Sequence, residues 1–344
     1  MRGKPSRRSS GGEEHRLVGG MTPVKAKEDL PVQVLDSADS LAETENAAFK
    51  SGFVTLIGRP NSGKSTLLNH LLGEKVSIVS DKPQTTRHKI LGIHTRAEGQ
   101  IVFADTPGVH KPGYELNRRM MRAVYDALEG IDLLLAMVDA TAAFGSGDRY
   151  LVELIKQRGL PTLLLLNKID LLAKARLLPL IDFYSRQFQF AEIIPVSALK
   201  GDNLNLLLEQ ILKYLPAGPA YFPDSQFTDS PERFLAAEMV REKVVRQTEQ
   251  ELPYSTIVVL KRFEEDQEAS RVRIYCDICV ERESQRKIVI GRQGQKLKTI
   301  GAAARKDIER LLGKPVYLDL FVKVRPKWRD DPRFLDSELG VRQT

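Results

Sequence analysis

Short apolar runs alternate with longer amphipathic stretches from Phe53 onward. The runs are FVTLI, IVFA, LLLAMV, TLLLLN and EIIPV, and stretches with helical periodicity separate them. Near-continuous apolar strands that alternate with helices are typical of a mostly parallel sheet covered on both faces. The pattern therefore predicts an α/β domain over residues 50–216.

The pattern changes in the segment LPAGPAYFPDSQFTDSP, where repeated proline disfavours both helix and sheet and predicts a linker over 217–232. An amphipathic helix from Phe234 to about residue 251 should follow. After it we expect two strands (STIVVLKRF and RVRIYCDICVE), a short helix, a glycine turn, a helix that ends at Leu312, and the strand VYLDLFVKV. This order predicts a smaller α+β domain over 233–330 and a tail over 331–344.

Residues 1–49 are rich in Ser, Gly, Pro and mixed charge, and they show neither sustained periodicity nor the apolar core of a signal peptide. We therefore expect a disordered N-terminal extension. The opening MRGKPSRRSS could be a targeting segment or an extension without a function, and Met21 could be an alternative start.

Two features of the composition exclude some classes of protein. No apolar run approaches the roughly 18 residues of a membrane span, which argues against an integral membrane protein. The two cysteines form a single CxxC in a strand-like segment, Cys276 and Cys279. Residues three apart on a strand point to opposite faces, so we expect one buried and one outward thiol and no shared zinc. Such sparse cysteine fits a reducing, cytoplasmic setting.

Positive charge is concentrated near the C-terminus. Residues 286–329 carry thirteen Lys and Arg against three acids, a local net of +10, whereas the whole chain has +7, so the remainder sums to −3. A local basic surface is typical of a protein that binds a polyanion, although it could also be a solvated face.

The first glycine loop has the spacing of a phosphate-binding loop. FVTLIGRPNSGKST places Gly58, Gly63, Lys64 and Ser65 in the pattern GxxxxGK[ST], after an apolar strand and before a helical run from Thr66. Such a loop turns backbone N–H groups toward phosphate, its lysine neutralises phosphate oxygens, and its hydroxyl ligates Mg²⁺. The α/β domain is therefore predicted to be a P-loop NTPase domain.

Two further motifs lie downstream in the order that a nucleotide site requires. IVFADTPG ends a strand at Asp105, which supplies a carboxylate for Mg²⁺, and adds Gly108, whose N–H can bind a γ-phosphate. LLLLNKID supplies Asp170, whose carboxylate can accept both the ring N–H and the exocyclic amine of guanine, which adenine does not present in that geometry. The site therefore favours GTP over ATP.

Lys168 can lay its stem along the base, Asn167 can tie the loops together, and PVSAL adds backbone contact near the guanine oxygen. The candidate GTP-binding residues are Gly58, Asn61, Ser62, Gly63, Lys64, Ser65, Thr66, Asp105, Thr106, Pro107, Gly108, Asn167, Lys168, Asp170, Ser197 and Ala198.

These motifs, together with DKPQTTRHKILGIHT and DTPGVHKP, resemble the Era family of translation-factor-related GTPases over about residues 50–330. The resemblance implies a switch threonine that closes on Mg²⁺, either Thr85 or Thr86; we favour Thr86, which makes Ser65, Thr86 and Asp105 the candidate metal-binding set. In many GTPases a glutamine that orients the attacking water follows the DxxG glycine, but here the residue is Val109.

No catalytic side-chain base is therefore identified, and hydrolysis should be slow or depend on another group. Resemblance to a subgroup with Asn in the phosphate loop, here Asn61, implies a K⁺ ion in the role of an arginine finger. Equally fast hydrolysis in Na⁺ and K⁺ buffers would argue against that ion.

The second glycine loop, Gly291-Arg292-Gln293-Gly294, lies between two helical segments, and Lys296 and Lys298 follow it. The order of elements around it resembles a type II KH domain, in which GxxG holds the backbone of about four unpaired nucleotides. A GxxG alone commonly marks only a turn, but this one coincides with the basic segment. We therefore predict an RNA-binding loop at these six residues. Trp328, the only tryptophan, either stacks on a base or anchors the last strand.

Together these features predict a cytoplasmic, monomeric GTP hydrolase that uses Mg²⁺ and whose nucleotide state alters how a KH module binds RNA. The family resemblance implies that the RNA is the 3′ end of 16S rRNA and that the process is maturation of the small ribosomal subunit. Two alternatives are a GTP-gated RNA-binding scaffold in which hydrolysis is incidental, and a GTPase that contacts anionic lipid at the inner face of the cell membrane through its basic surface.

Overall fold

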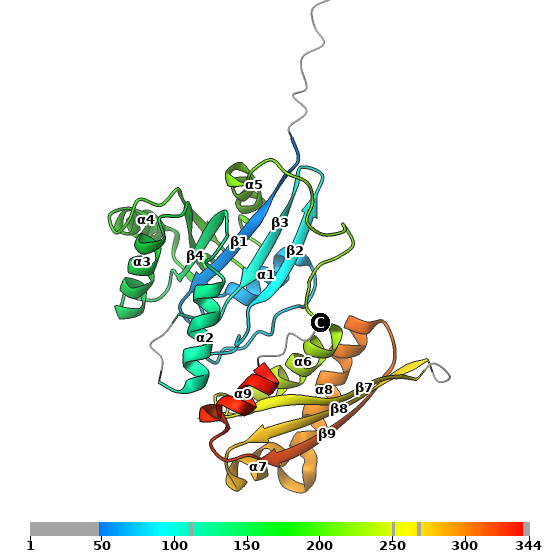
Figure 1. The fold of residues 1–344 in the computed structure, drawn as a ribbon. Helices are drawn as coiled ribbons and strands as arrows, with labels where there is room; N and C mark the ends of the chain where they lie inside the picture. Colours follow the sequence, from blue (N-terminus) through cyan, green and yellow to red (C-terminus); the bar gives the residue numbers. More distant parts are fainter. Residues whose placement is uncertain (1–47, 110–112, 250–251, 267–269, 340–344) are drawn as a thin grey trace, which may run out of the picture. The chain divides into compact units, whose positions relative to one another are not determined.

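A computed structural model describes residues 48–109, 113–249, 252–266 and 270–339, which all belong to one compact unit (Figure 1). The predicted disorder of residues 1–49 falls almost entirely outside the described residues, as do residues 340–344 of the predicted tail. Among the residues described, no helix combines the length and the apolar character that a bilayer span requires.

The first sheet has six strands in the order β2-β3-β1-β4-β5-β6. All neighbouring pairs are parallel except β2 and β3. The strands are β1 (Lys50–Gly58), β2 (Ile90–Arg96), β3 (Gly99–Asp105), β4 (Leu133–Asp139), β5 (Thr162–Asn167) and β6 (Glu192–Val196). The helices are α1 (Lys64–Leu72), α2 (Glu115–Asp126), α3 (Ser146–Arg158), α4 (Leu177–Ser185) and α5 (Leu204–Tyr214). A mostly parallel sheet with helices on both faces is the predicted arrangement.

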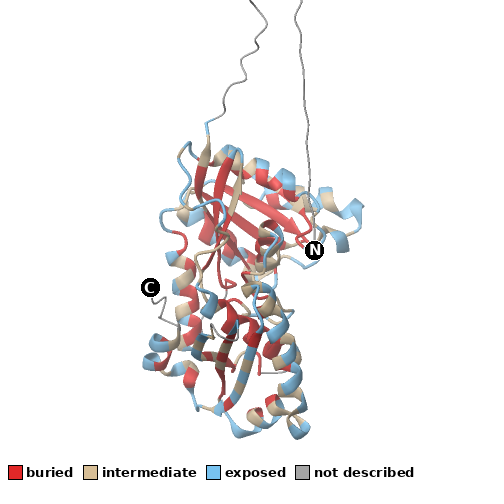
Figure 2. Ribbon diagram, turned by 90° about the vertical axis from the view of Figure 1, so that its right-hand side faces the viewer, coloured by how far each residue is buried: buried red, intermediate tan, exposed pale blue. Residues whose placement is uncertain are grey.

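Alternate residues of the central strands enter two different cores. On one face of the sheet, Leu56 and Leu135 pack with side chains of α1 and α5. On the other face, Ile57 and Ala136 pack with α2, α3 and α4. Because both faces are covered, the strands carry the continuous apolar runs seen in the sequence, and Figure 2 shows them as largely buried.

The sequence did not predict the edge strand β2, in which Gly92 interrupts the apolar positions. In the structure this strand is bordered by the predicted linker. The backbone N–H of Ile93 donates to the carbonyl of Phe227 at 2.9 Å, and the Thr228 hydroxyl donates to the carbonyl of Leu91 at 2.6 Å. The predicted linker is therefore held along the edge of the first sheet.

The second sheet has three strands in the order β7-β8-β9, where β7 (Ile257–Asp266) is antiparallel and β9 (Val316–Val324) parallel to β8 (Arg271–Val280). Helices α6 (Glu232–Gln247), α7 (Glu283–Ile290) and α8 (Gln295–Leu312) accompany it, in the order that the sequence predicts for a type II KH fold. Buried residues of α6, α7 and α8 pack on this sheet, and Ile274, Ile278 and Ile300 lie at the centre of the core.

The prediction of one buried and one outward thiol is wrong, because both cysteines are buried. They do point to opposite faces of β8. Cys276 lies in the core beneath the helices, whereas Cys279 lies with Trp328 and Leu335 in a separate cluster. The 3-10 helix η4 (Trp328–Asp330) and helix α9 (Pro332–Leu339) contribute to this cluster and bury the face that was expected to be open to solvent.

Helix α6 also differs from the amphipathic helix that was predicted. All residues from Leu235 to Val245 are buried, including Glu238, Arg241, Glu242 and Lys243. The charged face of the helix is covered because it contacts residues 75–88, which precede β2. This contact connects the domain of the first sheet to the domain of the second.

Candidate nucleotide and RNA sites

The phosphate loop spans the turn between β1 and α1, and its conformation depends on glycine. Gly63 has φ +106°, and a Cβ there would lie 2.1 Å from the side-chain nitrogen of Asn167. Lys64 is buried, and its ammonium donates to the carbonyls of Gly58 and Arg59, both at 3.2 Å. Burial lowers the pKa of Lys64 to about 8, although the charge of Asp105 partly opposes this shift. The loop thus holds a poorly solvated cation where a phosphate would offset its charge.

Three oxygen-bearing side chains from separate segments meet beside this loop. The Ser65 hydroxyl donates to the Asp105 carboxylate at 2.6 Å, and its oxygen lies 2.8 Å from the Thr86 hydroxyl oxygen. Ser77, which the sequence did not indicate, donates to the same carboxylate oxygen at 2.8 Å. Burial raises the pKa of Asp105, a tendency that the charge of Lys64 partly offsets.

These side chains suit a magnesium ion in their chemistry. The second carboxylate oxygen of Asp105 is buried without a hydrogen-bond partner in the described part of the chain. Hydroxyl and carboxylate oxygens are the ligands that Mg²⁺ prefers, and a divalent cation would compensate a buried carboxylate. Ser65, Thr86 and Asp105 therefore fit the ion that the sequence implies. The described residues contain no cluster of three or more His, Cys, Asp or Glu that could hold a metal ion.

The structure distinguishes between the two candidate switch threonines. Thr86 is 7% exposed, and its hydroxyl reaches Ser65. The hydroxyl of Thr85 instead donates to the carbonyl of Lys82 at 2.6 Å. Thr86, the alternative favoured from the sequence, is thus the threonine whose hydroxyl lies beside Ser65.

The residues predicted to bind guanine lie at the carboxyl ends of β5 and β6. The Asn167 side chain donates to the carbonyl of Ser62 at 2.7 Å and accepts from the backbone N–H of Ala198 at 2.9 Å. It therefore joins the phosphate loop to the loop after β6. The Ser197 hydroxyl donates to Asp170 at 2.7 Å, which fixes the carboxylate predicted to bind the base.

Asp139 is a further residue at this site that the sequence reasoning missed. It ends β4 and forms an ion pair with Lys168 at 2.6 Å, which holds the lysine ammonium at the carboxyl end of that strand. The sequence did contain a signal for it. LLLAMVD ends an apolar strand in an acidic residue, as IVFAD does, and ligands bind beside the carboxyl ends of parallel strands.

The remaining residues of the DTPG segment support the phosphate loop. Thr106 is buried and donates through its hydroxyl to the carbonyl of Leu56 at 2.6 Å. Pro107 is also buried, and a Cβ on Gly108 would lie 2.7 Å from Pro60, so the segment packs directly on the loop. Val109 is 2% exposed and lies in the apolar core, where it cannot orient a water molecule.

Two phosphate-loop side chains remain. The Asn61 amide nitrogen donates to the carbonyl of Asp81 at 2.6 Å, which connects the phosphate loop to the segment before β2. The Ser62 hydroxyl is buried and has no hydrogen-bond partner among the described residues. Thr66 follows Ser65 in the first turn of α1.

The second glycine loop lies between α7 and α8 as the 3-10 turn η3 (Arg292–Gly294). Gly291 and Gly294 have φ +73° and +75°, and a Cβ on Gly291 would lie 2.6 Å from the Cβ of Lys296. Arg292, Gln293 and Lys298 are exposed, and Lys296 is half-buried. A groove of about 440 Å³ adjoins the loop, and it is lined by Gly294, Leu297, Lys298, Gly301, Ala302, Arg305, Leu318 and Leu320.

Trp328 anchors the end of the second domain and does not present a stacking surface. Its side chain is fully buried, and its indole N–H donates to the carbonyl of Ser255 at 3.0 Å. The guanidinium of Arg87 lies 5.6 Å from the ring centroid. Of the two alternatives for this residue, the structure supports the anchor.

Comparisons with known proteins agree with this arrangement. Residues 53–168 match a family model described as 50S ribosome-binding GTPase, and residues 251–329 match the KH domain model. The chain is similar to GTPase Era from Syntrophus aciditrophicus (strain SB), with 50% identity over 295 residues that cover 86% of this chain and 96% of that protein.

Two solved structures of Era are similar over most of the fold. One is Era in complex with MgGDPNP and nucleotides 1506–1542 of 16S ribosomal RNA, with a TM-score of 0.81 and 44% identity over 83% of this chain and 97% of that one. The other is a variant of Aquifex aeolicus Era bound to GDP and AlF4⁻, with a TM-score of 0.81 and 43% identity over 83% and 98%.

The fold and its phosphate-loop site define a P-loop GTPase domain that is followed by a KH domain. Because half of the 295 aligned residues are identical to those of a GTPase Era, and the alignment covers most of both chains, the protein belongs to the GTPase Era family.

Proposed function

We propose that this GTPase uses GTP binding and hydrolysis to control how its KH domain binds the 3′ end of 16S rRNA during maturation of the 30S subunit. The observation that carries the proposal is the position of Thr86. Its hydroxyl lies beside Ser65, in the candidate magnesium-binding set, while its sequence neighbours, Thr85 and Arg87, contact the KH half of the protein. The related Era structure that holds both MgGDPNP and 16S rRNA supports the same pairing of ligands.

In this proposal the phosphate loop binds the β- and γ-phosphates through its backbone N–H groups and Lys64. Asp170 selects guanine, and Asn167 holds the base-binding and phosphate-binding loops together through its hydrogen bonds to Ser62 and Ala198. Ser65, Thr86 and Asp105 would hold Mg²⁺, which neutralises phosphate charge when it is bound. Bound γ-phosphate would stabilise Thr86 at this set and hydrolysis would release it, so the segment that carries Thr86 acts as the switch.

The attack of water has no side-chain base in this proposal, because Val109 is directed into the core. The phosphate loop and Gly108 orient the γ-phosphate through their backbone N–H groups. K⁺ is proposed as an additional cation beside Asn61, whose amide oxygen would be its ligand.

The KH loop would hold unpaired nucleotides against Gly291 and Gly294, and the exposed Lys298 and Arg305 would contact phosphates along the groove. The division into a GTPase domain (50–216), a linker (217–232), a KH domain (233–330) and a tail (331–344) is part of the proposal. So are a monomeric state, contact with the small subunit, a cytoplasmic location and peripheral contact with the membrane.

The RNA site is tested with two glycine variants at opposite ends of α8. Gly294 and Gly313 both have positive φ, and a Cβ at either meets no atom within 4 Å, so a substitution to Asp imposes a similar backbone cost at each. Only the change at Gly294 would place a carboxylate beside the bound phosphates. We expect Gly294→Asp to weaken binding of a short single-stranded RNA from the 16S 3′ end by about tenfold or more, as loss of phosphate contacts would.

The matched Gly313→Asp variant should bind that RNA within about twofold of the unchanged chain, as a substitution remote from the phosphates should. The assay is fluorescence anisotropy at two salt concentrations with the GTP analogue GDPNP and Mg²⁺ present. Equal affinity for the Gly294→Asp variant and the unchanged chain would contradict the RNA site.

A further inference from the structure

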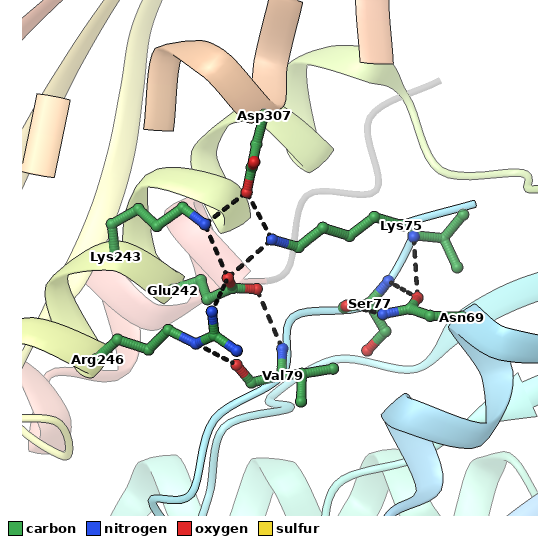
Figure 3. A network of polar contacts seen from close by, with 9 residues as sticks. Asn69, Lys75, Ser77, Val79, Glu242, Lys243, Arg246 and Asp307 are labelled. Carbon is green, nitrogen blue, oxygen red and sulfur yellow. Dashed lines mark hydrogen bonds and ion pairs between the residues drawn. The ribbon is translucent and has the colours of Figure 1, made fainter. Parts of the chain in front are cut away.

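The charged face of α6 is buried against residues 75–88, the segment that ends just before β2. The Val79 backbone N–H donates to Glu242 at 3.2 Å, and Arg246 donates to the carbonyl of Val79 at 3.0 Å (Figure 3). Farther along the same segment, Arg241 donates to the carbonyl of Thr85. The KH domain's first helix therefore contacts the backbone of the switch segment at two places.

Arg241 is the most strongly constrained of these contacts. Its side chain is 2% exposed, and a paired hydrogen bond to Glu238 holds the guanidinium, from Nε at 2.7 Å and from Nη2 at 2.6 Å. The same Nη2 donates to the Thr85 carbonyl. Because a planar guanidinium gripped by a carboxylate has little freedom to rotate, it offers that carbonyl a donor in a fixed position.

The carbonyl of Thr85 belongs to the peptide unit that connects directly to Thr86. Holding this peptide plane therefore constrains the backbone from which the Thr86 side chain projects toward Ser65. On the other side of Thr86, the buried Arg87 donates to the carbonyls of Thr256 at 2.7 Å and Pro253 at 3.1 Å. Both sequence neighbours of Thr86 are thus hydrogen-bonded to the KH half of the protein, Thr85 through its carbonyl and Arg87 through its side chain.

We propose that Arg241 is a positioning residue for GTP hydrolysis: held by Glu238, it keeps the Thr85–Thr86 peptide where the Thr86 hydroxyl reaches the magnesium-binding set. The inference rests on the proposed role of Thr86 as the switch threonine. It assigns part of the GTPase centre to a helix outside the GTPase fold. In the described part of the chain the hydrogen bonds and ion pair of Arg241 go to Glu238 and Thr85, and neither belongs to the phosphate loop or the predicted guanine-binding residues, so its effect should be confined to states in which Thr86 is engaged.

The test removes the guanidinium together with the carboxylate that holds it. In the full-length chain we would combine Glu238→Gln with Arg241→Gln and measure GDP affinity, GDPNP affinity with Mg²⁺, and single-turnover GTP hydrolysis. GDP affinity should stay within about twofold, whereas GDPNP affinity and the hydrolysis rate should each fall by about tenfold, the size expected for one hydrogen bond to a charged group. A purely structural role would change the affinities for both nucleotides together.

Arg246→Gln is the matched control, because Arg246 lies on the same helix and also donates to a switch-segment carbonyl, but at Val79. It should change the GDPNP-to-GDP affinity ratio by less than about twofold, because a half-exposed contact remote from Thr86 contributes little. If the double variant does not fold, Arg241→Lys decides the matter. Its single ammonium can pair with Glu238 but cannot also hold a donor in a fixed position toward the Thr85 carbonyl. GDPNP affinity and the hydrolysis rate should therefore fall, whereas GDP affinity should not.

The inference and the proposed function fail in different ways. If the unchanged chain hydrolyses GTP and binds GDPNP in a Mg²⁺-dependent manner, but the Arg241 variants behave identically to it, the positioning role is overturned. If the unchanged chain shows no Mg²⁺-dependent response to the γ-phosphate, the proposed switch itself is contradicted.

Discussion

Replacing Asp170 by Asn should lower GTP affinity by at least about 100-fold, since two hydrogen bonds to a charged acceptor contribute roughly 1.5–3 kcal/mol each. Asp170 is fixed by a 2.7 Å hydrogen bond from Ser197, and its carboxylate is the group proposed to accept both donors of guanine. An amide offers one acceptor and one donor, so the guanine amine would face a donor.

The same variant should gain affinity for XTP, because xanthine carries a carbonyl where guanine carries the exocyclic amine. Competition against a fluorescent GDP analogue, with GTP, ATP and XTP, measures both changes. Asp202→Asn is the matched control, because Asp202 is an exposed carboxylate in the turn that follows Ala198. Unaltered GTP affinity in the Asp170→Asn variant would show that another group recognises the base.

The second large effect is expected at the charge cluster of Lys75, Glu242, Lys243, Arg246 and Asp307, which joins the two domains (Figure 3). The Glu242 side chain is 0% exposed, and its carboxylate lies 2.7 Å from the ammonium of Lys75 and 3.0 Å from that of Lys243. Removing one partner of a buried ion pair commonly costs 3–5 kcal/mol; the cations here are partly exposed, so we expect Glu242→Gln to lower the free energy of unfolding by about 3 kcal/mol.

The pH dependence of this loss follows from the pKa of Glu242. Burial acts to raise that pKa, but the hydrogen bonds and charge supplied by Lys75, Lys243 and the Val79 backbone N–H together outweigh burial and hold it below the ordinary value of 4.5. A carboxylate with a lowered pKa in the folded protein stabilises the fold above its ordinary pKa, and this stabilisation is lost as the pH falls through the folded value. The difference between the unchanged chain and the variant should therefore be constant above pH 4.5 and shrink below it.

Urea unfolding followed by the emission of the buried Trp328 measures both quantities. Glu153→Gln is the control, since its pair with Lys156 on α3 has side chains that are 61% and 45% exposed. That change should cost less than about 0.5 kcal/mol, as exposed pairs on a helix do. A Glu242→Gln variant no less stable than the control would show that the cluster does not hold the domains together.

The charge cluster also suggests a physical route between the two sites. Lys75 begins the switch segment, and its ammonium lies 2.7 Å from Asp307 on α8, the helix that starts directly after Gly294. A shift of the proposed switch segment on loss of the γ-phosphate would therefore act on the helix that borders the proposed RNA groove. Coupling of this kind must be reciprocal, so RNA should also favour the GTP-bound form.

The sequence predicts the strands and the nucleotide motifs well, because both depend on local patterns. The apolar runs predict β1 and the strands β3 and β4 that flank it in the sheet. The spacing of Gly58, Lys64 and Ser65 is sufficient to predict a phosphate site. The order of elements in the KH domain could likewise be predicted, and the strand VYLDLFVKV has the same bounds in the structure, Val316–Val324.

What the sequence does not predict depends on contacts between distant segments. The charged residues of α6 follow an ordinary amphipathic pattern, and nothing local shows that the switch segment covers Arg241 and Glu242. Cys279 likewise alternates to the face that should be open, which becomes buried only because α9 and η4 return to it. Asp139 differs from these residues, because a local pattern does indicate it: like Asp105, it is the acidic residue that ends an apolar strand.

The most direct test of the account is the affinity of the 16S 3′-end RNA for the protein loaded with GDP and for the protein loaded with GDPNP and Mg²⁺. The contacts that connect Thr85, Arg87 and Lys75 to the KH domain predict tighter binding in the GDPNP state, by about fivefold or more if the coupling is of ordinary size. Equal affinity in the two states would contradict the account, because the nucleotide site and the RNA groove would then act independently.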